Sequence, residues 1–296
     1  MDSTVDSLLA NLHLSDNADT GSGREDPLPD ASPVEAAASA HVGLPVRLIT
    51  TPSAAAAATE HLRRHPTLAV DCEDVNLSRT GRLCTVQVAS PTRAYVFDLV
   101  ADNSLLQPGM ADLLSDEAVV KVFHDCRHDA EALAHQAGVW VKGVRDTQVA
   151  YGLSRLHAGQ SRPIPVSLTT LFRLHAPRSR GSGGVAGAAF KGRIKARYGT
   201  TPDLWAVRPL DVDALTYATT DVVHLVTIHA ALARRCGPRA EERLAVAATA
   251  YAASFRDRPE GVGEAAARAD FQSLCAAADA GRARRRSSRT RTGGYR

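Results

Sequence analysis

The sequence lacks several patterns that would assign it to a class at once. It has five cysteines, an odd number, and no C-x-x-C pair. We therefore expect neither a disulfide framework nor a zinc site, and a reducing compartment, cytoplasmic or nuclear, fits best. No apolar run approaches the ~18 residues that a membrane span needs. The first residues lack a basic stretch followed by an apolar one, and they are acidic and poor in Arg, so we expect neither a signal peptide nor a mitochondrial transit peptide.

A strong excess of charge is also missing, since the formal net charge is only +3 over 296 residues. The charges are unevenly distributed, however. Residues 1–44 are acidic and rich in Asp, Ser, Ala and Pro, which predicts a disordered segment. Residues 256–296 are predicted to be a disordered Arg-rich tail, because the last fifteen residues hold seven Arg and no acid. One folded domain is expected over residues 45–255, interrupted by a Gly-rich stretch at 178–189.

The hydrophobic pattern of this domain predicts a mixed α/β sheet. A short strand near Val46 precedes a helix capped at Thr51 or Ser53, and three strands with short links should then be antiparallel neighbours. Strands and helices alternate from Val119 to Leu156, and only helices are expected after that, including one long helix over 212–235. The three linked strands are 67–72, 83–89 and 94–99, and the second should place Cys84, Val86 and Val88 on one side.

The most informative stretch is LAVDCEDVNL, where an apolar strand ends in two acids. Asp71 and Glu73 are two residues apart, so their side chains point to the same face of the strand. Two carboxylates beside a buried strand are costly unless a positive charge lies between them. Carboxylate oxygens suit Mg²⁺ or Mn²⁺, which indicates a metal site.

Two later motifs extend this pattern. Asp129 follows the predicted strand 119–124 at the start of a helix, and Tyr217 and Asp221 are four apart and so lie on one helix face. Each motif alone is weak, because exposed acids at strand ends and on helices are common. Their order, D-x-E, then Asp, then Y-x-x-x-D, in matching strand and helix contexts favours a real site.

This ordered set resembles the DEDDy branch of the 3′→5′ exonucleases, the ribonuclease D-like proteins. The stretches DCEDVNLSRTGRLCTVQVA, KVFHDC, DTQVAY and LWAVRPL look closer still to the Egalitarian-type exonuclease-domain proteins. The resemblance covers about Arg47 to Arg235. It implies a ribonuclease H-like α/β fold, with a mixed five-stranded sheet flanked by helices. It also implies hydrolysis from the 3′ end of nucleic acid, RNA rather than DNA, with release of nucleoside 5′-monophosphates.

The resemblance also implies a role for each motif residue. Asp71 would bridge two divalent cations, Mg²⁺ or Mn²⁺, while Glu73 and Asp221 complete the site of the metal that holds the attacking water. Asp129 would anchor the second metal. It is preferred over its rival Asp125, because the family pattern places the acid five residues after His124. Tyr217 would orient the water or help to deprotonate it, and a phenol that titrates near 10 favours orientation.

A nuclease must also hold its substrate, and several residues are candidates for that contact. They are Asn76, Ser78, Arg79 and His124 near the acidic motifs, and Lys191, Arg193 and Lys195 in FKGRIKARYG. The alternative for the basic stretch is a solvated helix face. Asp74, Asp98 and Asp146 are expected to be structural, with Asp146 capping a helix, and Trp205 is expected in the core.

Two other functions remain open from the sequence. The same scaffold could serve as a non-catalytic RNA-binding adaptor, although the five retained motif residues argue against it. It could also be a proofreading or repair exonuclease that acts on DNA. The disordered ends could dock a protein partner, and no membrane partner is expected.

Overall fold

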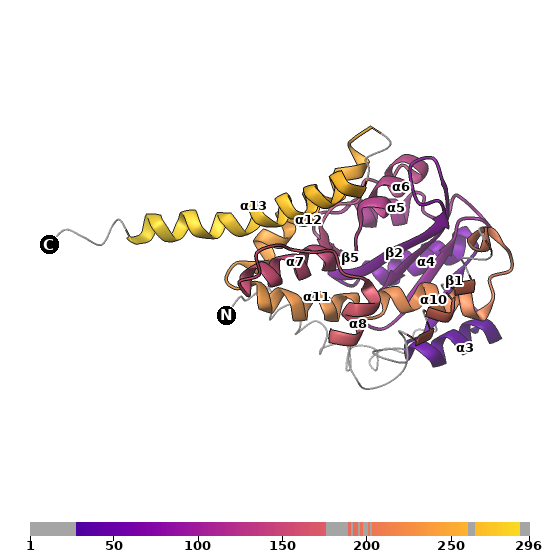
Figure 1. Cartoon of the computed structure of the whole chain (residues 1–296). Helices are drawn as coiled ribbons and strands as arrows, with labels where there is room; N and C mark the ends of the chain where they lie inside the picture. The colour runs from indigo at the N-terminus through magenta and orange to yellow at the C-terminus, as the bar shows by residue number, and fades with distance from the viewer. Residues whose placement is uncertain are drawn as a thin grey trace.

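The computed structural model describes residues 28–175, 189–190, 192–194, 196–197, 201, 203–259 and 264–290. Its centre is a six-stranded mixed sheet in the order β1-β4-β3-β2-β5-β6, with helices on both faces (Figure 1). This is the α/β, ribonuclease H-like arrangement that the sequence predicts. The sheet has one strand more than the five implied by the resemblance, because short strands pair at both of its edges.

The strands follow the predicted positions closely. As expected, β2, β3 and β4 form consecutive antiparallel pairs, whereas β1, β5 and β6 each join the sheet in parallel. Their bounds are β1 (Val46–Ile49), β2 (Thr67–Val75), β3 (Arg82–Ala89), β4 (Ala94–Asp98), β5 (Val120–Phe123) and β6 (Val144–Asp146). The carboxyl ends of the parallel strands β2, β5 and β6 therefore meet at one edge of the sheet.

The antiparallel pair β2–β3 contains a bulge that corrects one prediction. Glu73 pairs with Thr85 but Asp74 pairs with Leu83, so Cys84 is an extra residue in β3. A bulge reverses the side to which the following residues point. Cys84 therefore lies in a different buried cluster from Val86 and Val88, and the predicted strict alternation is wrong at Cys84.

The turn between β2 and β3 requires glycine. A Cβ at Gly81 would lie 2.0 Å from the carbonyl oxygen of Asn76, which is far too close for any side chain. Asn76 itself has a left-handed backbone, with φ of 62°, which asparagine tolerates better than most residues. This close turn fixes the loop that follows the two acids of β2.

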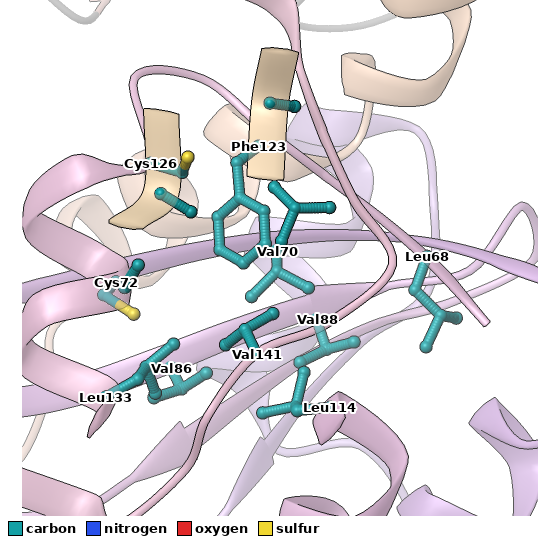
Figure 2. Close-up of a cluster of buried hydrophobic side chains, with 14 of the residues drawn as sticks. Leu68, Val70, Cys72, Val86, Val88, Leu114, Phe123, Cys126, Leu133 and Val141 are labelled. Carbon is teal, nitrogen blue, oxygen red and sulfur yellow. The ribbon is translucent and has the colours of Figure 1, made fainter. Parts of the chain in front are cut away.

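The larger hydrophobic core lies on one face of the sheet. Figure 2 shows its centre, where Val70, Val86 and Val88 of the sheet meet Phe123 and Leu133. The helices that bury residues in this core are α4 (Pro52–Leu62), α5 (Gly109–Ser115), α6 (Arg127–Ala137), α7 (Thr147–His157), α8 (Leu168–His175), α11 (Leu225–Ala233) and α12 (Ala240–Arg256). The five cysteines are buried and free, in agreement with the predicted absence of disulfides.

The opposite face carries a smaller core formed by α3 (Pro33–Val42), η1 (Leu204–Ala206) and α10 (Val212–Val222). Leu215 and Ala218 of α10 are buried against the sheet there. The capping box of α3 joins Ser32 and Glu35, and Glu35 also accepts a hydrogen bond from the Leu48 backbone of β1 at 2.7 Å. This part of the predicted disordered segment 1–44 is therefore ordered, and that prediction is wrong for α3.

Three further predictions need correction. The predicted tail contains α13 (Glu264–Thr290), whose Phe271 and Cys275 are fully buried against α7 and α12, and which then continues away from the rest of the protein (Figure 1). The predicted helix 212–235 is two helices, α10 and α11, followed by η2 (Arg234–Cys236). Most of the Gly-rich stretch, residues 178–188, lies outside the described residues. None of the described helices is long and apolar enough to cross a bilayer.

Candidate active site

Three carboxylates converge between the sheet and α10. Asp71 and Glu73 of β2 and Asp221 of α10 each place one oxygen so that all three lie within 4.8 Å of one another. Asp221 is 4% exposed, whereas Asp71 and Glu73 are partly exposed, so the group is open to solvent on the side of β2. An all-oxygen, all-carboxylate set fits a hard divalent cation such as Mg²⁺ or Mn²⁺. The structure thus brings together three of the four predicted metal ligands in one group.

The two acids of β2 reach this place because of strand alternation. Leu68, Val70 and Cys72 point into the larger core, so the residues between them point to the opposite face. That face is covered by α10, whose N-cap Asp211 accepts a hydrogen bond from the Ala214 backbone at 2.8 Å. Burial of Leu215 then fixes the helix rotation that turns Asp221 toward β2.

The segment before α10 is tied to the sheet by an ion pair. The Arg208 guanidinium donates to both oxygens of Asp98, from Nε at 2.6 Å and from Nη2 at 2.5 Å, and also to the Trp205 carbonyl at 2.7 Å. Asp98 closes β4 and is 2% exposed. Its predicted structural role is borne out, and Arg208 holds η1 and the start of α10 against the strands that carry the acids.

Tyr217 lies beside these carboxylates in a protected position. Its ring centroid is 6.0 Å from that of Trp205, which is buried as predicted. Burial, followed by the negative charges of Glu73 and Asp71, raises the pKa of the Tyr217 phenol well above its ordinary value. The phenol therefore keeps its proton at neutral pH, and it can donate a hydrogen bond but not accept a proton as a base.

Asp129 lies near Asp71 but not within the group of three. It is 4% exposed, and burial together with the Asp71 charge raises the pKa of its carboxyl well above the ordinary value. Burial, and then the charges of Asp129 and Asp71, likewise raise the pKa of the Cys72 thiol. Asp129, Cys72 and Asp71 are therefore close neighbours, and a cation near Asp71 would relieve the repulsion between the two acids.

Asp125, the alternative to Asp129 as a metal ligand, is bonded to Arg127 and Tyr251. Arg127 donates to both of its oxygens at 2.7 and 2.9 Å, and the Tyr251 hydroxyl donates to it at 2.8 Å. The Arg127 guanidinium also lies 4.9 Å above the Tyr251 ring and 4.8 Å above the Phe255 ring. This contact between the loop before α6 and helix α12 was not predicted, and no sequence spacing reveals it, because the partners lie 126 positions apart.

Two of the residues predicted to contact the terminal nucleotide have structural partners. Arg79 donates to Glu131 at 2.6 Å and to the carbonyls of Phe255 and Arg258 at the end of α12. The Ser78 hydroxyl accepts from the Gly81 backbone at 3.0 Å. Arg79 therefore holds the β2–β3 loop against α6 and the end of α12, and Ser78 closes a turn within the loop. Asn76 is exposed at the turn.

His124 and the basic stretch have separate locations. His124 lies at the end of β5, with Nδ1 2.8 Å from the Thr147 hydroxyl at the start of α7. Asp146 caps that helix, as predicted, by accepting from Gln148 and Val149. In the basic stretch, the exposed Arg193 lies 5.6 Å from the Phe190 ring centroid. Lys191 and Lys195 lie outside the described residues.

The sequence comparisons find similar proteins over much of the described part of the chain. Residues 46–176 match the sequence model of the family described as "3'-5' exonuclease". The chain is 34% identical over 192 residues to ribonuclease D of Nitrobacter hamburgensis, covering 62% of this chain and 43% of that protein. It is 31% identical over 183 residues to the piRNA biogenesis protein EXD1 of Mus musculus, covering 60% of this chain and 30% of that protein. The chain is thus similar over residues 46–176 to the 3′→5′ exonuclease family, and over about three fifths of its length to ribonuclease D and EXD1.

The solved structures support the fold. The Trypanosoma brucei RNase D complex with GMP aligns with a TM-score of 0.61 at 22% identity, covering 78% of this chain and 71% of that one. The complex of the same enzyme with RNA aligns with a TM-score of 0.57 at 22% identity, and the alignment covers 80% of this chain and 82% of that one. The Caenorhabditis elegans Egalitarian protein homolog matches over only 96 residues at 35% identity, 31% of this chain and 17% of that protein. The predicted special closeness to Egalitarian-type proteins is therefore limited to that stretch.

Proposed function

We propose that this protein is a metal-dependent 3′→5′ exonuclease that removes nucleoside 5′-monophosphates from the 3′ end of RNA. The observation that carries the proposal is the convergence of Asp71, Glu73 and Asp221 within 4.8 Å, with Tyr217 and Asp129 beside them. The family match supports the reaction type. The chain spans less than half of the two curated relatives described above, so their whole activities are not transferred with it.

Asp71, Glu73 and Asp221 would hold one divalent cation, and Asp71 with Asp129 a second. Bound there, the cations would neutralise phosphate charge, lower the pKa of water and stabilise the leaving oxygen. The protein's own contribution is to gather four acids that repel one another on rigid elements. Tyr217 donates a hydrogen bond that orients the attacking water or the scissile phosphate, since its protonated phenol cannot serve as the base.

The choice of RNA rests on the relatives. The similar proteins include ribonuclease D, and the structural neighbour from Trypanosoma brucei is a complex with RNA. A substrate with a free single-stranded 3′ end fits the site best, because a phosphate must reach carboxylates that lie between β2 and α10. Hydrolysis rates of a single-stranded RNA and a single-stranded DNA of the same sequence test the preference for RNA directly.

The test is nucleotide release from a 3′-labelled single-stranded RNA by the wild type and by Asp71→Asn. We expect release of 5′-monophosphates with Mg²⁺ or Mn²⁺, none with EDTA, and a loss of at least ~10³-fold in the variant, on the scale of a lost electrostatic catalytic group. Asp102→Asn, a change at a partly exposed loop acid that contacts Ser104, is the matched control. Tight RNA binding without release under either metal would reject the enzyme and leave the RNA-binding adaptor.

A further inference from the structure

Two segments of the chain that meet in the folded protein contain no acid. Residues 147–202 contain no Asp or Glu, and neither do residues 222–240. The first stretch includes α7 and α8, and the second includes α11 and η2. These elements contact one another, because α7 packs on α11 and η2, and α8 packs on α11. The two segments that contain no acid therefore lie side by side in the folded protein.

The cations of this surface gather where three helices end. Arg155 lies in the last turn of α7, Arg173 in the last turn of α8, and Arg234 and Arg235 form η2 after α11. We call these four arginines the η2 surface. Arg173, Arg234 and Arg235 are exposed, and no described carboxylate forms an ion pair with any of the four.

Two contacts show that the helix ends meet. The ring of His157, at the end of α7, lies so close to Gly237 that a Cβ there would be 2.5 Å from it. The pKa of His175, at the end of α8, is lowered by burial and then by the Arg235 guanidinium, which places these two side chains near each other. The η2 surface is thus one patch contributed by three helices.

Stabilisation of helix ends explains only part of this charge. Each helix C-terminus carries about half a negative charge, so three ends call for roughly one and a half positive charges. Four arginines exceed that requirement, and none is balanced by a described acid. The excess marks a surface suited to a polyanion.

The other ends of these helices lie at the candidate active site. Thr147 at the start of α7 contacts His124 at the carboxyl end of β5. Val166, just before α8, donates to Gln148 of α7 at 2.7 Å, and α11 begins four residues after Asp221. The nine residues of α11 span ~14 Å, which separates the carboxylate end of this helix from the η2 surface.

We propose that the η2 surface binds the phosphates of the substrate strand on the 5′ side of the end being hydrolysed. This rests on the proposed function, since a 3′ end at the carboxylates leaves the remainder of the strand to run along α11. The protein would accordingly favour long strands over dinucleotides through electrostatic contacts that carry no sequence preference.

The test compares strand lengths in the variant Arg234→Gln/Arg235→Gln. For a single-stranded RNA of about twelve nucleotides we expect KM to rise about tenfold with kcat unchanged, and the dependence of log affinity on log salt to fall by ~0.7 per lost phosphate contact. Hydrolysis of a dinucleotide should stay the same. The matched control is Arg64→Gln/Lys142→Gln, which removes two exposed positive charges elsewhere on the surface.

Fluorescence anisotropy of the same labelled RNA, measured in EDTA, separates this proposal from the exonuclease. Binding that weakens in the η2 variant but not in the control supports the surface even if the protein hydrolyses nothing. An unchanged KM and affinity for the long strand, or an equal change for the dinucleotide, would overturn it. Loss of binding to phosphatidylserine vesicles with RNA binding intact would assign the surface to a lipid and would also overturn it.

Discussion

At the residue scale, the surroundings of Tyr217 decide which step it can assist. The phenol is buried beside Glu73 and Asp71, and each of these charges opposes its ionisation. A residue that keeps its proton can position a water or a phosphate oxygen throughout the neutral pH range. Any base must then be found among the carboxylates or in metal-bound water, and not in the tyrosine.

The variant Tyr217→Phe tests this assignment. Loss of one hydrogen bond to a charged group costs ~1.5–3 kcal/mol, so kcat should fall roughly 10- to 100-fold. The pH–rate profile of the wild type should show no phenol ionisation between about pH 6 and 9, because the pKa of Tyr217 lies above its usual ~10. A basic limb that is present in the wild type and missing in the variant would contradict the orienting role.

At the scale of elements, the buried carboxylate of Glu241 joins β6, α11 and α12. Glu241 of α12 accepts from Arg145 of β6 at 3.0 Å and lies 3.3 Å from Nε2 of His229 in α11. Burial alone would raise the pKa of Glu241, but the hydrogen bonds and charges of His229 and Arg145 lower it to about 2. The contact therefore stabilises the packing of α12 only while Glu241 is ionised.

The pH dependence of unfolding should report this contact. Because the pKa of Glu241 is lower when folded than its ordinary ~4.3, its stabilisation is complete above that value and is lost as the pH falls toward 2. In urea titrations at pH 7 we expect Glu241→Gln to lower the free energy of unfolding by about 3 kcal/mol. The difference in this free energy between the variant and the wild type should shrink below pH 4. The exposed neighbour Glu242→Gln is the control, and parallel pH profiles would refute the assignment.

Helix α12 also positions the loop that leads to Asp129. The hydroxyl of Tyr251 holds Asp125, whose backbone has φ of 60°, four residues before Asp129. Tyr251→Phe should lower kcat several-fold while costing only about 1 kcal/mol of stability. Ser254→Ala, which removes a hydroxyl bonded only to the Tyr251 carbonyl of the same helix, should leave kcat unchanged. Equal effects of the two changes in kcat assays would rule out the positioning role.

The sequence predicted the elements whose patterns are local. Strand alternation predicted that Asp71 and Glu73 share a face, and helix periodicity predicted the same for Tyr217 and Asp221. The break between α10 and α11 escaped prediction because Val223 and His224 carry no Gly or Pro signal. The burial of Phe271 in α13 depends on contacts with distant helices, and the Arg-rich composition of the last residues suggested disorder instead.

At the scale of the whole molecule, the candidate site is assembled from two distant parts of the chain. The segment that matches the exonuclease family, 46–176, supplies Asp71, Glu73 and Asp129. Tyr217 and Asp221 come from α10, which follows that segment and packs on β2, β3 and β4 from the opposite face (Figure 1). Neither part alone contains the three converging carboxylates.

This division makes the protein a candidate for fragment complementation. A cut between α8 and η1 would give one piece with the sheet and another with α10 to α13, each incomplete. Because Leu215, Ala218 and Val222 of α10 bury apolar surface against the sheet, the two pieces should associate when mixed. Nuclease activity would then rise with the product of their concentrations. If each piece is fused to one of two proteins, RNA cleavage would report whether those two proteins associate.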